Sequence, residues 1–473
     1  MSKKEEKSKN GEAVSLNRRS FLKLTGLTAG TVGATAVTGI PTAEAGERPS
    51  SAVTDFAVNQ VKTPTYDQKP FKDSGKQKRF DYSKVAFEHE TLKKKKFGGV
   101  SWYEAMAENQ VKLAQKNVSG YTHLDWALDQ AAWTAYNMSY YDDPENPASL
   151  ASWTPFMGPL HPDLKQWKAS PEANNHYIKK AAHFFGAGPT GVAKLKEEWF
   201  YTKSGYAGYP EIIFSDKHDT PLRTNEACYI PKSMNRVIVM TTPTDGMLLK
   251  YTPSVTGGLG TSHGYSRMAE LAGKMCEFIR MLGYNAIPTI DCASLIVPQA
   301  IEAGLGELGR NGLLVNPELG QNLRITTVVT DMPMDVDNPI EFGVAEFCKT
   351  CKKCADLCPS QSISKDDDTT YETACPSNNP GMKKYFVNTW SCLEFWVSSG
   401  GGCSNCIAVC PYSKPGTWIH DIVKAVSSKT PAFNSTFVKM DDLLGYGQTL
   451  EKHKDPFEWW RSKGRPKTWP KGF

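Results

Sequence analysis

Apolar residues recur at helical spacing along several stretches of the chain. Residues 102–116 and 125–136 each show this pattern, and the Ala and Trp stripe of the second stretch is interpreted most simply as core. Apolar positions repeat with the same period from 268 to 279, and Leu282-Gly283 ends that predicted helix. Shorter helical pieces are expected at 178–186, 191–200, 298–303 and 418–427.

β-Branched residues indicate strands in the middle of the chain. Residues 236–241 read Arg-Val-Ile-Val-Met-Thr, which is typical of a buried strand. Between this strand and the helix at 268–279, the Gly, Ser and Thr-rich stretch 252–264 is predicted to be a loop. Helices and strands therefore mix, and we predict an α+β core. Further strands are expected at 285–290, 313–315 and 323–330.

The strongest chemical signal is a run of cysteines near the C-terminus. Two groups each end in Cys-Pro, with spacings C-x2-C-x2-C-x3-C-P and C-x2-C-x3-C-P. This is the spacing of a bacterial ferredoxin with two [4Fe–4S] clusters, in which the last cysteine of each group reaches the other cluster. The predicted ligands are Cys348, Cys351, Cys354 and Cys410 for the first cluster, and Cys358, Cys392, Cys403 and Cys406 for the second.

Zinc binding and disulfide formation are two other uses of these cysteines that the spacing does not favour. Zinc sites separate C-x2-C pairs by a longer loop, and disulfides would not explain the repeated Cys-Pro ending. Within the cluster interpretation, Cys375 is an alternative to Cys392, which we prefer because it lies nearer to the second group.

Charge and cofactor motifs exclude several function classes. The 473 residues carry a net charge of +5, and the part after residue 45 carries only +2, so nucleic acid is not expected as a partner. No G-x-G-x-x-G motif opens a βαβ unit, and no C-x-x-C-H haem motif is present.

The N-terminus carries the features of an export signal. Residues 17–23 read Asn-Arg-Arg-Ser-Phe-Leu-Lys, a moderately apolar run follows to Ile40, and Ala43-Glu44-Ala45 is a cleavage site of the A-x-A type. We therefore predict a twin-arginine signal over 1–45, which is removed after Ala45. This route exports folded proteins, so clusters can be assembled in the reducing cytoplasm. No later segment is long and apolar enough to span a bilayer.

Together these features resemble the corrinoid-dependent reductive dehalogenases. The resemblance covers the whole chain and rests on the twin-arginine signal, the cysteine set and three short motifs. These motifs are Leu-Gly-Tyr-Asn-Ala-Ile-Pro at 282–288, Ala-Gly-Leu-Gly-Glu at 303–307 and Phe-Gly-Val at 342–344. The resemblance implies a nitroreductase-like α+β domain that binds base-off cobalamin, fed by a ferredoxin-like insert, and removal of halogen from an organohalide. The motif D-x-H-x-x-G, which supplies a histidine to cobalt in other corrinoid proteins, is missing; the nearest stretch contains His218 followed by Pro221.

The same resemblance implies three catalytic residues. Tyr265 would donate a proton and Arg324 would lower the pKa of that donor and stabilise the leaving charge, since an ordinary tyrosine is a weak acid. The family often has an asparagine at the position of Asp291, which could bond to Tyr265 or to a corrinoid amide. From the residues alone, Tyr265 could equally be a helix-start aromatic and Arg324 a strand-edge charge.

The expected organisation has five parts. They are the signal 1–45, an arm and helical region 46–130, a corrinoid- and substrate-binding core 131–335, a two-cluster domain 336–415 and a C-terminal strap 416–473. The arm is expected to be loosely ordered to residue 100, with Lys93–Lys96 as a solvated face.

The partners and the place of action follow from the resemblance and the signal. We expect a small chlorinated alkane or alkene as substrate, a small integral-membrane anchor, an upstream respiratory electron donor and a homodimer. The protein is expected to be attached peripherally to the exoplasmic face. Two alternatives remain: an epoxyqueuosine-reductase-like corrinoid enzyme, and an exported electron carrier of the ferredoxin type.

Overall fold

The computed structural model describes residues 74–75, 77–140, 149–206, 208–414, 434–443 and 455–462. The predicted signal and the predicted helix at 418–427 lie outside these residues. The helical elements, with 3₁₀ helices marked η, are η1 (Tyr82–Lys84), α4 (Glu90–Lys96), α5 (Trp102–Gln115), α6 (His123–Ala132), α7 (Thr134–Tyr140), α8 (Pro171–Phe184), η2 (Glu197–Trp199), η3 (Leu248–Tyr251), α9 (Val255–Met281), α10 (Ile296–Glu302), α11 (Val344–Cys351), α12 (Lys353–Asp356), α13 (Thr389–Ser399), α14 (Asn405–Ala408), η4 (Pro411–Ser413), α16 (Asn434–Leu443) and α17 (Phe457–Arg461).

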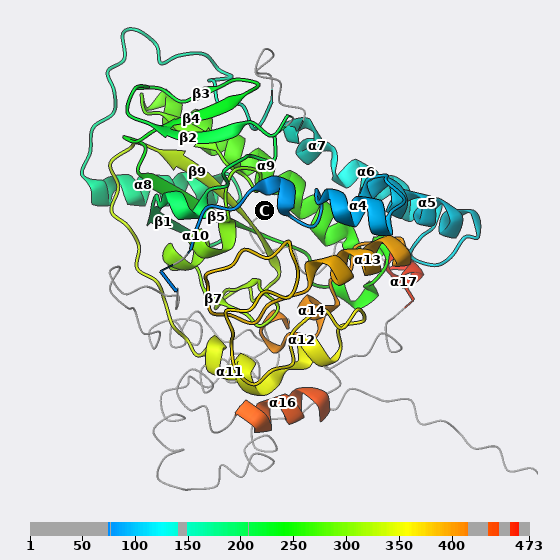
Figure 1. Ribbon diagram of the computed structural model, residues 1–473. Coiled ribbons are helices and arrows are strands. Elements are labelled where there is room, and N and C mark those ends of the chain that lie inside the picture. The colour runs from blue at the N-terminus through cyan, green and yellow to red at the C-terminus, as the bar shows by residue number, and fades with distance from the viewer. Residues whose placement is uncertain are drawn as a thin grey trace, which may run out of the picture.

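The core is an antiparallel sheet of four strands in the order β1-β5-β9-β6. The neighbouring strands β5 and β9 are longest and pair along their whole length, so that Thr242 lies opposite Arg324. β-Branched residues fill both strands, as expected for a sheet buried on two faces. A three-stranded sheet β2-β4-β3 lies beside it (Figure 1). The strands are β1 (Thr190–Lys194), β2 (Glu211–Ser215), β3 (Leu222–Arg223), β4 (Ala227–Pro231), β5 (Arg236–Pro243), β6 (Ala286–Pro288), β7 (Glu307–Leu308), β8 (Leu314–Val315) and β9 (Leu323–Thr330).

Helices cover both faces of the main sheet. One face carries Ile238, Met240 and Val328, which pack against α8 and α9. The opposite face packs against α10 and the smaller sheet. The observed architecture is thus a mixed α+β fold, as predicted.

The longest helix, α9, corrects the prediction of a loop over 252–264. The helix begins at Val255, after Ser254 accepts a hydrogen bond from the backbone N–H of Gly257. Glycines disfavour a helix in isolation, but here they allow close packing. A Cβ on Gly264 would lie 2.8 Å from the Thr244 side chain and 3.0 Å from that of Arg324. Tertiary contact, rather than local propensity, therefore makes this stretch helical.

Two further local predictions were wrong. Residues 191–200 were expected to be helical, but they form most of β1 and the short η2. Of the arm expected to be loosely ordered, 46–73 lies outside the described residues, but α4 forms near its end because Leu92 and Phe97 are buried against α13. These contacts join segments about 300 residues apart, which a local pattern does not report. Lys94, Lys95 and Lys96 are exposed, as expected of a solvated face.

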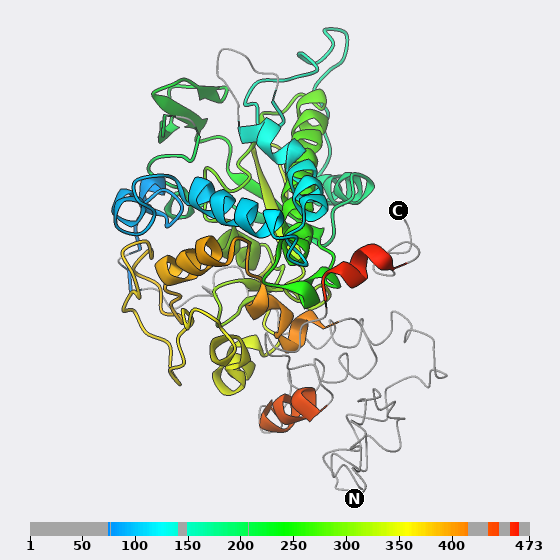
Figure 2. The same cartoon turned by 90° about the vertical axis from the view of Figure 1, so that its right-hand side faces the viewer.

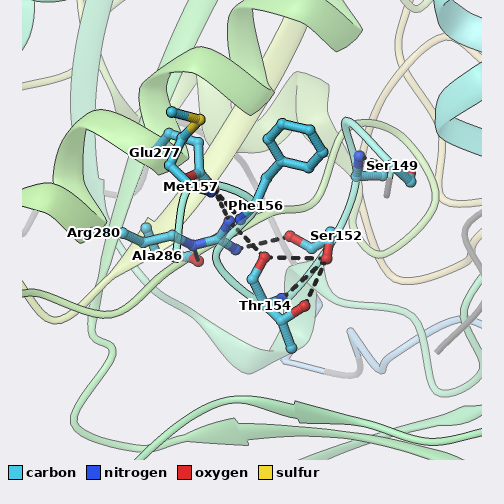
Figure 3. Close-up of polar contacts among 9 residues, drawn as sticks. Ser149, Ser152, Thr154, Phe156, Met157, Glu277, Arg280 and Ala286 are labelled. Atoms are coloured by element: carbon cyan, nitrogen blue, oxygen red, sulfur yellow. Dashed lines mark hydrogen bonds and ion pairs between the residues drawn. The ribbon is translucent and has the colours of Figure 1, made fainter. Parts of the chain in front are cut away.

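A buried arginine fastens the loop 149–157 to the end of α9 (Figure 3). Arg280 is 8% exposed and donates to the carbonyls of Ser152 at 2.7 Å and Ala286 at 3.0 Å. It also pairs with Glu277 at 2.6 Å, and the Glu277 carboxylate accepts from the backbone N–H groups of Phe156 and Met157. This clamp fixes the helix to the loop and to β6.

The cysteine-rich segment forms the lower part of the molecule in Figure 1. Its helix α11 contacts β7 of the small β7-β8 ribbon, α12 packs on α14, and α13 lies along α5 (Figures 1 and 2). Glu307 of β7 accepts from the backbone N–H groups of Phe342 and Val344 and so holds the start of α11. In the part of the chain that the structure describes, no helix has the length and apolar character needed to cross a membrane.

Candidate functional site

The three predicted catalytic residues meet at one end of the main sheet. Tyr265 lies on α9, Arg324 near the start of β9 and Asp291 just after β6. The Arg324 guanidinium carbon is 5.3 Å from the centre of the Tyr265 ring, and its Nη2 donates to Thr261 Oγ1 at 2.6 Å. All three side chains are largely but not completely buried.

Two aromatic residues that the sequence assigned to core complete this site. Trp133 and Tyr136, at the junction of α6 and α7, lie 5.2 and 4.9 Å from the Tyr265 ring between centroids. Tyr136 donates its hydroxyl to Asp291 Oδ1 at 3.1 Å. The sequence did not reveal that Trp133 and Tyr136 belong to this site, because an aromatic stripe on a helix is usually core. Their spacing of three residues indicated only that they lie on the same side of a helix.

Backbone geometry aims Asp291 at the site. The preceding residue, Ile290, has φ of +40°, which is unfavourable for a β-branched residue. Its side chain is 2% exposed in the core beneath α9. The backbone N–H of Thr289 donates to the Thr327 carbonyl at 3.0 Å, which fixes the turn to β9. Strain of this kind is held at functional sites by surrounding contacts.

Electrostatics keeps the phenol of Tyr265 protonated. Burial, followed by the negative charge of Asp291, raises the pKa of Tyr265 to about 12, although Arg324 lowers it. Burial also raises the pKa of Asp291 despite its hydrogen bond from Tyr136. The contribution of Arg324 has the expected sign, but the pKa of Tyr265 lies above the ordinary value and not below it. At neutral pH the side chain of Tyr265 is therefore the neutral phenol and not the phenolate.

The cysteines of the two predicted sets lie close enough to one another to interact electrostatically. Burial raises the pKa of the thiols of Cys348, Cys354, Cys392 and Cys403, and neighbouring thiols raise it further. For Cys348, Cys351 and Cys354 these neighbours include Cys410. For Cys392 they are Cys406 and Cys358, and for Cys403 they are Cys406, Cys392 and Cys358. The ligand assignment itself stays a prediction.

The alternative ligand, Cys375, has a different environment. Its sulfur lies 3.3 Å from Thr389 Oγ1, and its backbone N–H donates to Asn378 Oδ1 at 3.1 Å. Cys392, by contrast, is one turn into α13 and acts on Cys403. This placement favours Cys392 over Cys375.

The two cysteine sets adjoin each other and the site. Cys354 of the first set packs with Cys358 and Cys406 of the second. Cys406 in turn acts electrostatically on Arg324. The second set is therefore the one beside the predicted catalytic residues.

Several buried polar groups at and near Arg324 have no hydrogen-bond partner among the described residues. The hydroxyls of Thr242 and Thr326 and the Nε of Arg324 are buried, and no hydrogen bond to them is formed within the described part of the chain. Thr242 lies opposite Arg324 in the β5-β9 register, and Thr326 follows two residues later on the same face. On α9, Gly258 precedes Tyr265 by two turns, and a Cβ there would meet nothing within 4 Å. These features suit a large polar-edged ligand.

Histidine 218, in the stretch nearest to the missing D-x-H-x-x-G motif, has a local role. Its ring nitrogen Nδ1 lies 2.8 Å from Ser215 Oγ, and its ring stacks on Tyr229 at 4.5 Å. Both partners belong to the small sheet β2-β4-β3, away from Tyr265.

Comparison with known proteins decides the family. Residues 347–413 match the 4Fe-4S double cluster binding domain. The chain is 33% identical over 468 residues to the tetrachloroethene reductive dehalogenase of Sulfurospirillum multivorans, with 91% of each protein covered. The chain belongs to the reductive dehalogenase family. It is also 33% identical over 384 residues to a tetrachloroethene reductive dehalogenase of Desulfitobacterium hafniense, covering 70% of this chain and 69% of that protein.

Solved structures support the fold. A reductive dehalogenase whose structure suggests a mechanism for B12-dependent dehalogenation superposes with a TM-score of 0.60 at 20% identity. The match covers 85% of this chain but only 53% of that longer chain. This reductive dehalogenase thus has the family fold, and its membership favours the dehalogenase prediction over the two alternatives.

Proposed function

We propose that this reductive dehalogenase removes chloride from a small chlorinated alkene, with a corrinoid and two [4Fe–4S] clusters as its cofactors. The observation that carries the proposal is the meeting of Tyr265, Arg324 and Asp291 beside the second cysteine set. Relatives named as tetrachloroethene, chloroethene and trichloroethene reductive dehalogenases support the substrate class.

The residues present fit a corrinoid in a nitroreductase-like domain. The ring edge of a corrinoid carries amides, which can bond with the buried hydroxyls of Thr242 and Thr326. The open face of α9 at Gly258 leaves room for a flat ligand against the helix. His218 is engaged with Ser215, in keeping with a base-off corrinoid without a protein histidine on cobalt. When bound, the corrinoid supplies the low-potential centre at which the carbon–halogen bond is reduced.

The cysteine residues fit the iron–sulfur clusters. Each set offers four thiols to one cluster, as the spacing requires. When bound, the two clusters supply one-electron transfer toward the site from an upstream donor. Since the second set acts on Arg324, it would hold the cluster nearer to the substrate.

The chain's own residues handle the proton and the developing charge. Replacing chlorine by hydrogen takes two electrons and one proton and releases chloride. Tyr265 keeps its proton at neutral pH and can give it to the substrate carbon, since its pKa of about 12 leaves the phenol intact. Arg324 then stabilises the phenolate across the ring, and Trp133 and Tyr136 form an apolar wall that excludes water.

Asp291 tunes the donor and does not donate to the substrate in this proposal. Its carboxylate accepts from Tyr136 and raises the pKa of Tyr265. It therefore works against early loss of the phenol proton and fixes the Tyr136 ring beside Tyr265.

The twin-arginine signal supports action on the exoplasmic face of the membrane. Attachment there would be peripheral, through a small integral-membrane partner, with electrons from a respiratory donor. A homodimer also belongs to the proposal.

The test is anaerobic halide release from chlorinated ethenes, chlorinated alkanes and chlorinated phenols, with a reduced dye as electron donor. The same preparation is assayed for cobalt and iron. Release from ethenes by protein that holds cobalt and about eight irons supports the proposal. Full activity without cobalt, or release from phenols alone, would overturn it.

A further inference from the structure

Arg324 contacts the helix α9 at two residues that lie one turn apart. The helix packs against β9, and Thr261 and Tyr265 are four residues apart on it, so their side chains lie on the same face. The Arg324 guanidinium donates from Nη2 to Thr261 Oγ1 at 2.6 Å, and its central carbon is 5.3 Å from the centre of the Tyr265 ring. The cation therefore lies between a hydroxyl and the predicted proton donor.

A glycine on α9 makes this close contact possible. Gly264 directly precedes Tyr265, and a Cβ on it would lie 3.0 Å from Arg324 Cγ and 2.8 Å from Thr244 Cγ2. Because a packed interior leaves no room for such an atom, a larger residue would displace the stem of Arg324. The glycine thus lets the stem lie against the helix, with the guanidinium within reach of Thr261.

Thr261 is the side chain that fixes the guanidinium. Among the described residues, no other side chain accepts a hydrogen bond from Arg324. Nη1 donates to the carbonyl of the neighbouring Leu323 at 3.1 Å, and the buried Nε forms no hydrogen bond in the described part of the chain. A charged donor makes the bond to Thr261 a strong one, and this bond restrains a long side chain that has many rotamers.

The position of this cation matters for the proposed proton transfer. A phenolate forms on Tyr265 as its proton leaves, and the attraction between this charge and the guanidinium falls with distance. A cation that is already in place stabilises the new charge without reorganisation. Arg324 lowers the pKa of Tyr265, whereas burial and Asp291 raise it. Displacement of Arg324 would therefore weaken the stabilisation that opposes burial.

We propose that Thr261 is a positioning residue for the reaction: its hydroxyl keeps the Arg324 guanidinium beside the Tyr265 ring, so that the cation is in place when the phenolate forms. The inference rests on the proposed role of Tyr265 as the proton donor. Thr261 acts through Arg324 and transfers no proton itself.

The ionisable groups around Tyr265 come from several elements. They are Tyr136 of α7, Tyr201 after η2, Asp291 and Cys292 after β6, and Arg324 of β9. Arg324 is the cation among these groups, so a change in its position has a defined sign: withdrawal of the guanidinium raises the pKa of the phenol.

Three variants separate the hydroxyl from the bulk of the side chain. Thr261→Val keeps the volume and removes the acceptor, whereas Thr261→Ser keeps the acceptor. Thr256→Val makes the first change elsewhere on α9, where the Thr256 hydroxyl donates to Asp125 Oδ1 at 2.7 Å, and it serves as the matched control. If Thr261→Val does not retain its iron, Thr261→Ala removes the same acceptor and takes its place.

The first measurement is the ionisation of Tyr265 in full-length, iron-loaded Asp291→Asn protein, where loss of the carboxylate brings the pKa of the phenol down from about 12. Tyrosinate absorbance is compared with that of the matching Tyr265→Phe protein. We expect added Thr261→Val to raise the midpoint of this titration, because the cation moves away from the phenolate. Added Thr261→Ser or Thr256→Val should leave the midpoint unchanged.

The second measurement is steady-state halide release by corrinoid-loaded protein. Thr261→Val should lower kcat by roughly 10- to 100-fold with KM unchanged, because a misplaced group reduces stabilisation in the transition state. Thr261→Ser should retain most of the activity, and Thr256→Val all of it. In Arg324→Met protein, Thr261→Val should cause no further loss, since its effect passes through Arg324.

An unchanged or lower midpoint on adding Thr261→Val would overturn the proposal. So would an equal loss of kcat in Thr261→Ser and Thr261→Val, or an undiminished effect of Thr261→Val in Arg324→Met protein. The titration needs neither organohalide nor corrinoid. Its outcome is therefore separate from that of the halide-release assay that tests the proposed function.

Discussion

At the scale of single residues, the site depends on how burial and charge balance around Tyr265. The phenol lies between a cation on β9 and a carboxylate after β6, and desolvation outweighs the cation. The aromatic pair Trp133 and Tyr136 contributes to this desolvation by covering the ring. The phenol of Tyr265 therefore keeps its proton and is not strongly acidic.

Replacing the donor tests its role. In Tyr265→Phe the ring and its contacts remain but the proton is lost, so halide release should fall by about 10²- to 10⁴-fold. Tyr284→Phe is the control, because Tyr284 donates only to the Trp167 carbonyl at the far end of α9. Halide release is measured in protein with equal iron and corrinoid content. Unchanged release in Tyr265→Phe would contradict the assignment.

The carboxylate of Asp291 has a distinct signature in the pH profile. It raises the pKa of Tyr265, so Asp291→Asn should bring that pKa down from about 12. Because the neutral phenol is the donor, activity is lost as pH rises through this pKa, and the variant should lose activity at lower alkaline pH than the unchanged protein. Tyrosinate absorbance, compared with that of Tyr265→Phe, follows the same ionisation. An identical alkaline limb in both proteins would count against the tuning role.

At the scale of elements, α9 organises the molecule. Its glycine-rich start lies beside the second cysteine set and the site, its middle packs on the sheet, and its end is clamped by Arg280. One continuous helix thus fixes the position of Tyr265 relative to the sheet. Sequence propensity alone would have broken this helix at its glycines.

The Arg280 clamp should be a large contributor to stability. Arg280→Met removes the cation that pairs with Glu277 and the donor to the carbonyls of Ser152 and Ala286, at a cost of about 3 kcal/mol in the free energy of unfolding. Lys274→Ala, which breaks an exposed pair with Glu270 on the same helix, should cost less than about 1 kcal/mol. Denaturant unfolding under anaerobic conditions compares the two. An equal decrease in the free energy of unfolding of the two variants would contradict the stabilising role of Arg280.

At the scale of the whole molecule, segments far apart in sequence pack against the cysteine-rich segment. The arm helix α4 and α5 pack on α13, and buried Lys353 of α12 pairs with Asp441 of α16. Arg310 joins the cysteine-rich segment to the ribbon that leads into β9. The cysteine-rich segment and the α+β core are therefore joined by buried contacts.

Iron content distinguishes the two possible eighth ligands. Cys392→Ser should lose the second cluster and hold about four irons per chain, since its thiol is a neighbour of Cys358 and Cys406. Cys375→Ser should keep about eight, because Cys375 bonds to Thr389 instead. Iron analysis of anaerobically purified protein measures both. The reverse pattern would exchange the two assignments.

The local sequence was sufficient for features that depend on spacing. The cysteine groups, the buried strand at 236–241 and the helix at 268–279 could be recognised because ligand spacing and side-chain periodicity act over a few residues. Tyr265, Arg324 and Asp291 came from resemblance, and their proximity could not have been derived from spacing. They lie on three different elements.

Only the tertiary structure decided the rest. The helical start of α9 and the formation of α4 depend on partners far along the chain, and so does the contact of Trp133 and Tyr136 with Tyr265. The raised pKa of Tyr265 needs both burial and a carboxylate from another element. Sequence therefore determined which groups the protein carries, and packing determined their environment, because desolvation and charge act through space and not along the chain.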